Sequence, residues 1–149
     1  DFVPADTAVR PGRTRSPFEL GLDWLVDFTK PVFNGRRALA EAMRKGSRWR
    51  LVRLDIDGNK PATDAYIFAR KRGGDSIGFV TSAAWSPVCK QSIALGTVDA
   101  RYGQPGETLY TEIFYRRELH WQRVMARATV VDGPFWNPAR RRATPPSRA

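Results

Sequence analysis

The sequence predicts a mainly β protein, in which a short α+β segment precedes a small antiparallel barrel of six strands. Apolar and polar residues alternate in several runs between residues 49 and 131, as they do in strands with one buried face. Short clusters of Gly, Pro, Asn and Asp separate these runs. The chain has 149 residues, of which 42% are hydrophobic, and this length suits one domain with its own core.

The first 45 residues precede the predicted barrel. Residues 1–16 hold prolines and charged residues without an apolar period, so we expect a loop or a severed connection there. Residues 17–28 are rich in apolar side chains, which we expect to be buried. Apolar residues recur at helical spacing over residues 35–45, which predicts a helix with Asn34 as its N-cap and Gly46 as its stop.

Six strands are predicted after this helix. They span residues 49–56, 65–71, 76–83, 92–100, 108–115 and 123–131. Residues 72–75 form a predicted hairpin turn, and residues 116–122, which include His120, are expected to form a loop. Residues 139–149 are basic and contain prolines, so we expect them to be a mobile tail.

The chain is strongly basic, with a formal net charge of +10. Basic proteins often bind nucleic acids, because neutralising the phosphates releases counterions. Here the cations are spread along the chain, and the densest run, residues 140–142, lies near the C-terminal end. Charge alone therefore leaves open a nucleic acid, an anionic cofactor or a solvated surface.

Other functional classes lack their sequence features. Cys89 is the only cysteine, which excludes an internal disulfide and a cluster of thiolate metal ligands. No run approaches the ~20 apolar residues of a membrane-spanning helix, and we expect a cytoplasmic protein. His120 is the only histidine and nothing places it near Ser82, which disfavours a serine hydrolase. No metal site is expected.

Glu19 is the strongest candidate for a functional side chain. It lies in the segment SPFELGL, inside an apolar run where a carboxylate needs a partner. Its two oxygens suit a bidentate contact with an N–H-rich edge of a ring. Ser16 stands three residues earlier, however, and the pair also fits a capping box that closes the start of a helix. Spacing alone favours the capping box.

A second candidate segment is GFVTSAAWSP, residues 78–87. We expect a strand that ends abruptly, with Thr81, Ser82 and Ser86 satisfying backbone groups in a tight turn. We expect Trp85 in this turn to be exposed, where its flat ring suits stacking on another ring or packing against a further domain.

The two segments, SPFELGLDWLVDF with FNGRRAL and GFVTSAAWSP with SIALGTV, resemble the C-terminal part of the aminomethyltransferase family. This family includes the glycine-cleavage T-protein and folate-dependent demethylases, and the C-terminal halves of dimethylglycine and sarcosine dehydrogenases are similar. The segment GPFWNP resembles the family's closing motif, whereas Ala83 replaces a usual glycine. The resemblance implies that residues 1–45 end a folate-binding domain, residues 46–138 form its C-terminal barrel, and residues 139–149 are a basic tail.

The resemblance implies tetrahydrofolate as cofactor and a methyl or aminomethyl compound as substrate. It implies that Glu19 holds the pterin and that Arg48 or Arg50 contacts folate; Trp85 suits stacking, and Arg140 suits the glutamate tail. The family's catalytic acid belongs to the N-terminal part, so no catalytic residue is assigned here, and we expect this fragment alone to be inactive. The implied partners are an N-terminal domain of the same protein and, in some branches, an FAD oxidoreductase domain. The alternative is a non-catalytic basic barrel that serves as a scaffold or binds nucleic acid. A nucleic-acid partner is disfavoured, because it does not explain the two segments.

Overall fold

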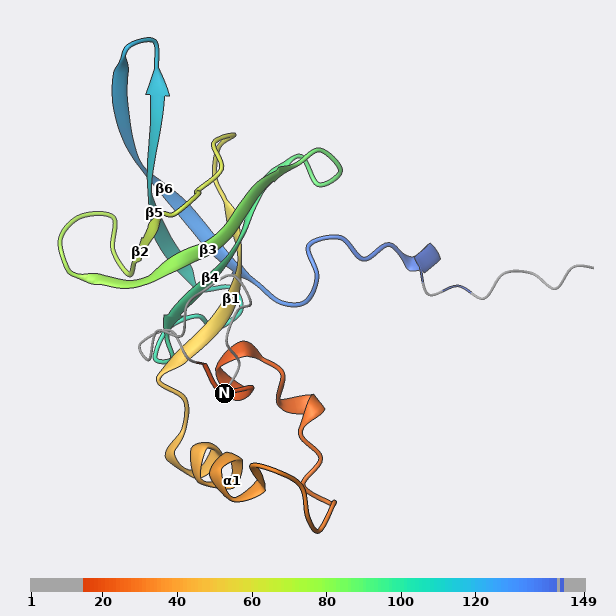
Figure 1. The fold of residues 1–149 in the computed structure, drawn as a ribbon. Coiled ribbons are helices and arrows are strands. Elements are labelled where there is room, and N and C mark those ends of the chain that lie inside the picture. Colours follow the sequence, from red (N-terminus) through yellow and green to blue (C-terminus); the bar gives the residue numbers. More distant parts are fainter. Residues whose placement is uncertain (1–14, 142, 144–149) are drawn as a thin grey trace, which may run out of the picture.

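The computed structural model, which describes residues 15–141 and 143, shows a closed barrel of six antiparallel strands (Figure 1). The strand order around the barrel is β1-β4-β3-β2-β5-β6. The predicted fold class is therefore confirmed. The strands are β1 (Trp49–Ile56), β2 (Tyr66–Phe68), β3 (Ser76–Ser86), β4 (Gln91–Asp99), β5 (Thr108–Arg117) and β6 (His120–Val131).

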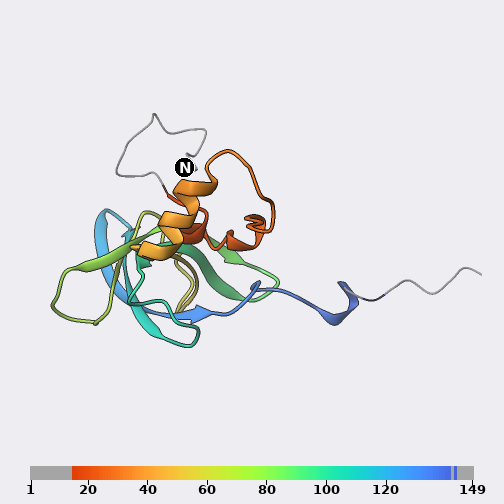
Figure 2. The same cartoon turned by 90° about the horizontal axis from the view of Figure 1, so that it is seen from below.

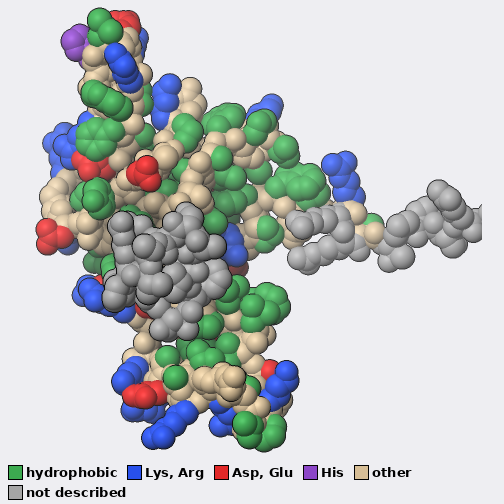
Figure 3. Space-filling model, viewed as in Figure 1, with side chains coloured by type: hydrophobic (Ala, Val, Ile, Leu, Met, Phe, Trp, Pro, Cys, Tyr) green, Lys and Arg blue, Asp and Glu red, His purple; other side chains and the backbone are tan. Residues whose placement is uncertain are grey.

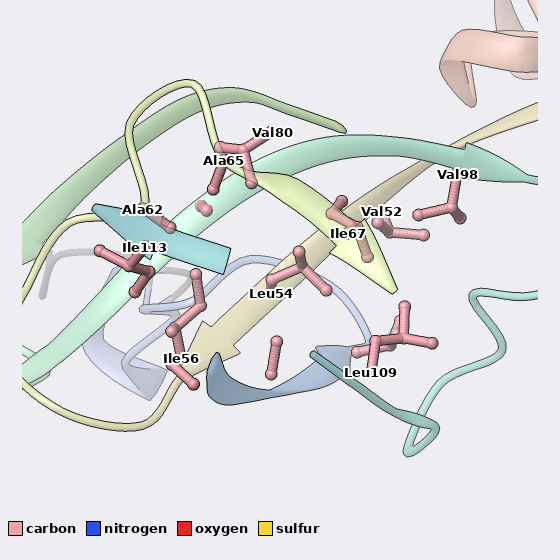
Figure 4. Packing of buried hydrophobic residues seen from close by; sticks show 14 residues of the cluster. Val52, Leu54, Ile56, Ala62, Ala65, Ile67, Val80, Val98, Leu109 and Ile113 are labelled. Atoms are coloured by element: carbon pink, nitrogen blue, oxygen red, sulfur yellow. The ribbon is translucent and has the colours of Figure 1, made fainter. Parts of the chain in front are cut away.

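The core fills the inside of this barrel. Alternate residues of β1, namely Val52, Leu54 and Ile56, are buried, because successive side chains of a strand point to opposite faces. They meet buried Ile67 of β2 and Leu109 of β5 (Figure 4). The other aliphatic members of the core are Ala62, Ala65, Val80, Ala94, Val98, Ile113, Ala126, Ala128 and Val130.

Two hairpins extend beyond the closed part of the barrel (Figure 1). β5 pairs with β2 only over residues 110–112, although it pairs with β6 along its whole length. The β5–β6 hairpin consequently projects as a two-stranded arm. β3 and β4 form the second arm, which contains a register shift at residues 80–82.

Several predicted boundaries in the barrel were wrong. β2 is three residues long because its pairing with β3 shifts register after Ile67, whereas the sequence predicted a strand over residues 65–71. β3 continues to Ser86 and does not end at residue 83. The expected loop at residues 116–122 is mostly strand, since Arg117 pairs directly with His120, and Glu118 makes the tight turn with φ 56°.

The segment before the barrel contains two short 3₁₀ helices, η2 (Phe18–Leu20) and η3 (Asp23–Leu25), and the helix α1 (Arg36–Lys45). The helix ends at Gly46, as predicted, but its N-cap is Gly35 and not Asn34. The expected burial of residues 17–28 was wrong: none of η2 or η3 is buried, and Trp24 is 75% exposed. Figures 1 and 2 show α1 beyond one end of the barrel.

The chain leaves β6 along an extended segment and reaches η4 (Ala139–Arg141). Most of the tail predicted at residues 139–149 lies outside the described residues. Within the described part of the chain, no helix is both long and apolar enough to cross a membrane.

Candidate functional site

Glu19 joins the segment before the barrel to the first barrel strand. Its backbone N–H donates to Ser16 Oγ (3.3 Å), and its Oε2 accepts from the Ser16 N–H (3.0 Å), so the expected capping box is present. Its other oxygen, Oε1, accepts from the N–H of Trp49, the first residue of β1 (3.2 Å). A carboxylate can accept about four hydrogen bonds, so each oxygen of Glu19 keeps capacity for a further donor.

Two arginines lie over the ring of Trp49, the first residue of β1. The guanidinium carbons of Arg15 and Arg48 lie 5.2 Å and 5.3 Å from the centre of the Trp49 ring, within cation–π distance. Arg50 is half-buried, and its stem lies beside Gly103. Glu19, Arg48 and Arg50 thus all lie at or next to the start of β1.

Asp99, which pairs with Trp49 in the sheet, forms an ion pair with Arg101. Arg101 Nε and Nη2 each donate to the Asp99 carboxylate at 2.9 Å, in a forked arrangement. These hydrogen bonds, supported by one from the Arg101 backbone N–H and by the charges of Arg101 and Arg48, lower the pKa of Asp99 to about 2. Asp99 therefore stays ionised at neutral pH and balances Arg101 at this end of the barrel.

Trp85 lies at the opposite end of the barrel. Ser92 pairs with Trp85 on one side and with Ile56, the last residue of β1, on the other. Asp99 pairs with Trp49 at the first residue of β1. These two rows are seven residues apart, or roughly 23 Å at 3.3 Å per residue. A single pterin ring cannot contact both Glu19 and Trp85.

The turn after Trp85 is fixed to the C-terminal segment. The Cys89 N–H donates to Ser86 Oγ (3.2 Å), and Cys89 Sγ donates to the carbonyl of Phe135 (3.4 Å). Ser86 thus has the turn role predicted for it, whereas Thr81 donates to the Leu95 carbonyl (3.1 Å) at the register shift. These contacts show how a motif in the β3–β4 arm and the closing motif come together.

An apolar hollow of about 410 Å³ lies between the C-terminal segment and the β3–β4 arm, and the sequence did not predict it. Its presence depends on Pro134 and Phe135 folding back over β4, a long-range contact that has no local signal. Its lining residues are Arg53, Ser82, Ala83, Ala84, Ile93, Ala94, Leu95, Pro134 and Phe135.

Arg140 lies beyond this hollow, in η4. Its guanidinium carbon is 5.7 Å from the centre of the Trp136 ring. Arg140 and Trp85 therefore belong with the C-terminal segment and the β3–β4 arm, and Glu19, Arg48 and Arg50 with the start of β1. The described residues contain no group of three His, Cys, Asp or Glu side chains that could hold a metal ion.

Comparison with known families agrees with this architecture. The family model described as "Glycine cleavage T-protein C-terminal barrel domain" matches residues 49–137. The chain belongs to this family. Its barrel is the family's C-terminal barrel, and the matched range contains Arg50 and Trp85, whereas Glu19, Arg48 and Arg140 lie outside it.

Relatives of this T-protein barrel extend the match upstream. The chain is 38% identical over 122 residues to an aminomethyltransferase of Synechococcus sp. (strain CC9311) and 40% identical over 122 residues to one of Parasynechococcus marenigrum (strain WH8102). Each alignment covers 81% of this chain and 30% of the relative. The chain thus spans about a third of the length of the curated aminomethyltransferases that it matches.

A solved structure gives the same result in three dimensions. The crystal structure of glycine cleavage system aminomethyltransferase T from Bartonella henselae matches with a TM-score of 0.66 and 26% sequence identity. The match covers 81% of this chain and 32% of that protein. The T-protein barrel and part of the segment before it are therefore shared.

Proposed function

We propose that this chain is the C-terminal part of a cytoplasmic enzyme that transfers a one-carbon unit from a methyl or aminomethyl donor to tetrahydrofolate. The observation that carries the proposal is the alignment of 81% of the chain with proteins named aminomethyltransferase. In this proposal residues 1–45 end the folate-binding domain, residues 46–138 are the barrel, and residues 139–149 are a basic tail. Bound tetrahydrofolate would supply the amine nitrogen that accepts the carbon.

Glu19 would bind the pterin while it holds the barrel in place. Two backbone N–H groups, those of Ser16 and Trp49, take up one acceptor position on each oxygen of Glu19. The remaining acceptor positions suit the adjacent amino and ring N–H groups of a pterin. Arg48 and Arg50, at the start of the same strand, would supply positive charge for the carboxylates of folate.

The other two proposed contacts lie at the far end of the barrel. Trp85 and Arg140 would reach a glutamate tail or another domain of the same protein, since they are separated from Glu19 by the length of β1. None of the described residues is assigned a catalytic role. The part played by this chain is to bind and orient the cofactor, which lowers the entropic barrier to transfer.

Exposed apolar side chains before the barrel support a further domain as partner. Trp24, Leu25, Val32 and Met43 are 75%, 60%, 85% and 63% exposed, and all precede β1. Contiguous exposed apolar surface marks sites of interaction. We propose that an N-terminal domain of the same protein covers them, in keeping with relatives about three times as long as this chain.

Calorimetric titration of tetrahydrofolate into the longest natural form of the protein tests the function. The Glu19→Gln variant should lose most of the affinity, because the amide offers only one acceptor oxygen where a pterin needs two. Ser16→Ala is the matched control, since it removes the Ser16 Oγ contact (3.3 Å) and leaves the carboxylate intact. The control should bind tetrahydrofolate as the parent does.

The thermal midpoint of each variant separates binding from folding. Equal affinity of Glu19→Gln and the parent would refute the role of Glu19. Absence of tetrahydrofolate binding by the folded parent protein would refute the proposed function itself. Equal losses in Glu19→Gln and Ser16→Ala would show that Glu19 acts only through the capping box that shapes its segment.

A further inference from the structure

Three aromatic side chains form a diagonal line on the outer face of the barrel. Thr111, Ile113 and Ala126 point into the core, so their neighbours in sequence on β5 and β6 point outward. Among the outward residues, Tyr66 of β2 is opposite Glu112 of β5, and Phe114 stands two residues after Glu112. Tyr66 and Phe114 are therefore diagonal neighbours, roughly 7–8 Å apart between Cα atoms.

The line continues onto the projecting hairpin. Phe114 of β5 is opposite Arg123 of β6, and Trp121 stands two residues before Arg123. Trp121 is thus the diagonal neighbour of Phe114, one row closer to the tip. Tyr66, Phe114 and Trp121 are 57%, 57% and 72% exposed. Three rings, one from each of three adjacent strands, therefore present surface to solvent along one direction.

Cations border this line of rings. The β2–β3 loop carries Arg70, Lys71 and Arg72, and it forms a hollow of about 570 Å³ with Phe68, Arg123 and Met125. Within the described part of the chain, none of the three loop cations makes an ion pair. Figure 3 shows basic and hydrophobic side chains together on the projecting hairpin.

One carboxylate on this face, that of Glu112, is already neutralised. Glu112 forms an ion pair with Arg123, and its side chain is 14% exposed. Arg127, two outward positions further along β6 than Arg123, pairs with Asp57 at 3.3 Å. The loop cations and Arg116, which is opposite Trp121, remain to attract an anion. The face therefore combines unpaired positive charge with rings that have no covering layer.

We infer that this outer face of β2, β5 and β6 binds single-stranded nucleic acid. Exposed rings on a sheet are the stacking platform that unpaired bases use, and neighbouring cations contact the phosphates. Bases stack along Tyr66, Phe114 and Trp121, and phosphates lie against Arg70, Lys71 and Arg72. A duplex buries the faces of its bases, and an acidic peptide has no bases. A single strand, in contrast, can contact both the exposed rings and the cations.

This inference is independent of the tetrahydrofolate proposal. It uses none of the residues Glu19, Arg48, Arg50, Trp85 and Arg140. The net charge of +10 left nucleic-acid binding open, and the exposed aromatic face gives it a location. Loss of oligonucleotide binding would therefore not count against tetrahydrofolate binding, and loss of tetrahydrofolate binding would not count against oligonucleotide binding.

Fluorescence anisotropy of a labelled single-stranded oligouridine of about 12 nucleotides, mixed with the 149-residue chain, tests the role of the rings. Trp121→Ala should raise the Kd about tenfold, and Phe114→Leu, which keeps an apolar side chain, should also raise it. Trp24→Ala is the matched control, because Trp24 is 75% exposed on η3, away from this face, and it should leave the Kd unchanged. Circular dichroism checks that each variant is folded.

The salt dependence of the Kd tests the cations. A variant with Arg70→Ala and Arg72→Ala should reduce the slope of log K against log salt by about 1.4, at about 0.7 for each lost phosphate contact. The control with Arg37→Ala and Arg44→Ala removes the same charge from α1 and should leave the slope unchanged.

Five results would overturn the inference. The first four are absence of oligouridine binding by the folded chain, equal losses in Trp24→Ala and Trp121→Ala, tighter binding of a duplex of the same length, and equally effective competition by polyglutamate. Free uridine monophosphate serves as a further arm. Competition by it at concentrations as low as those of the oligonucleotide would assign the face to a mononucleotide and likewise contradict the inference.

Discussion

Gly78 is the position where the barrel tolerates a side chain least. It lies on β3, opposite Val98 of β4. A Cβ added at Gly78 would overlap the carbonyl oxygen of Thr97, and it would lie 2.7 Å from Val98 Cα and 2.9 Å from the Thr97 carbonyl carbon. Carbon atoms pack best at about 3.5–4.0 Å, so the strands would have to separate by roughly 1 Å. We therefore expect Gly78→Ala to weaken the hydrogen bonds between β3 and β4.

The size of this effect follows from which atoms must move. Overpacking a core usually costs about 1–3 kcal/mol of the free energy of unfolding, and here all three contacts are backbone atoms of a paired strand. We expect a loss of about 3 kcal/mol or more for Gly78→Ala. Gly96→Ala is the matched comparison on β4, because its added Cβ lies farther from backbone, at 3.2 Å from the Phe79 carbonyl oxygen, and meets the end of the Ile67 side chain at 2.8 Å. That side chain can move, so the loss there should be about 1–2 kcal/mol.

Urea unfolding followed by tryptophan fluorescence measures both variants. Gly78→Ala should unfold at a clearly lower urea concentration than Gly96→Ala. In thermal unfolding, its Tm should fall by roughly 6–12 °C from that of the parent. Equal midpoints for the two variants, or a Gly78→Ala protein as stable as the parent, would refute the reasoning. Either result would show that β3 and β4 are farther apart at this row than the structure gives.

Two further predictions concern stability. Thr111→Val should raise the free energy of unfolding by about 1 kcal/mol, because the fully buried Thr111 hydroxyl has no hydrogen-bond partner among the described residues; a loss of stability would reveal a partner. Because folding lowers the pKa of Asp99 to about 2, its contribution to stability is present above about pH 4 and is lost as the pH falls towards 2. The stability difference between the parent and Asp99→Asn should shrink over that range in urea unfolding, and a pH-independent difference would contradict it.

The barrel could be predicted because residues in its closed part alternate between buried and outward positions. In β1 the residues Arg50, Val52, Leu54 and Ile56 alternate with outward ones, and the last three of them are buried. The arm of β5 and β6 has no such signal beyond Ile113. Arg116, Arg117 and His120 lie in the parts of β5 and β6 where no residue is buried, so their sequence resembles a loop although their backbones are paired.

The candidate site was predictable only where its contacts are local in sequence. The capping box of Ser16 and Glu19 follows from a spacing of three residues, but the hydrogen bond from the Trp49 N–H to Glu19 spans 30 residues and has no local pattern. The exposure of Trp24 was equally unpredictable, because an apolar run does not show what covers it. The position of Trp85 depends on the register between β3, β4 and β1, which only the closed barrel fixes.

Closure of the barrel also separates the two proposed binding activities. Glu19 acts at the first residue of β1, whereas Tyr66, Phe114 and Trp121 face outward from β2, β5 and β6. Alternate side chains between the two surfaces point into a packed core, so a ligand on one surface cannot contact the other through the barrel. A substitution on one surface should therefore leave binding at the other unchanged, since effects of distant, unconnected sites are additive. The outer face can accept a ligand without any change in the geometry that Glu19 imposes on the start of β1.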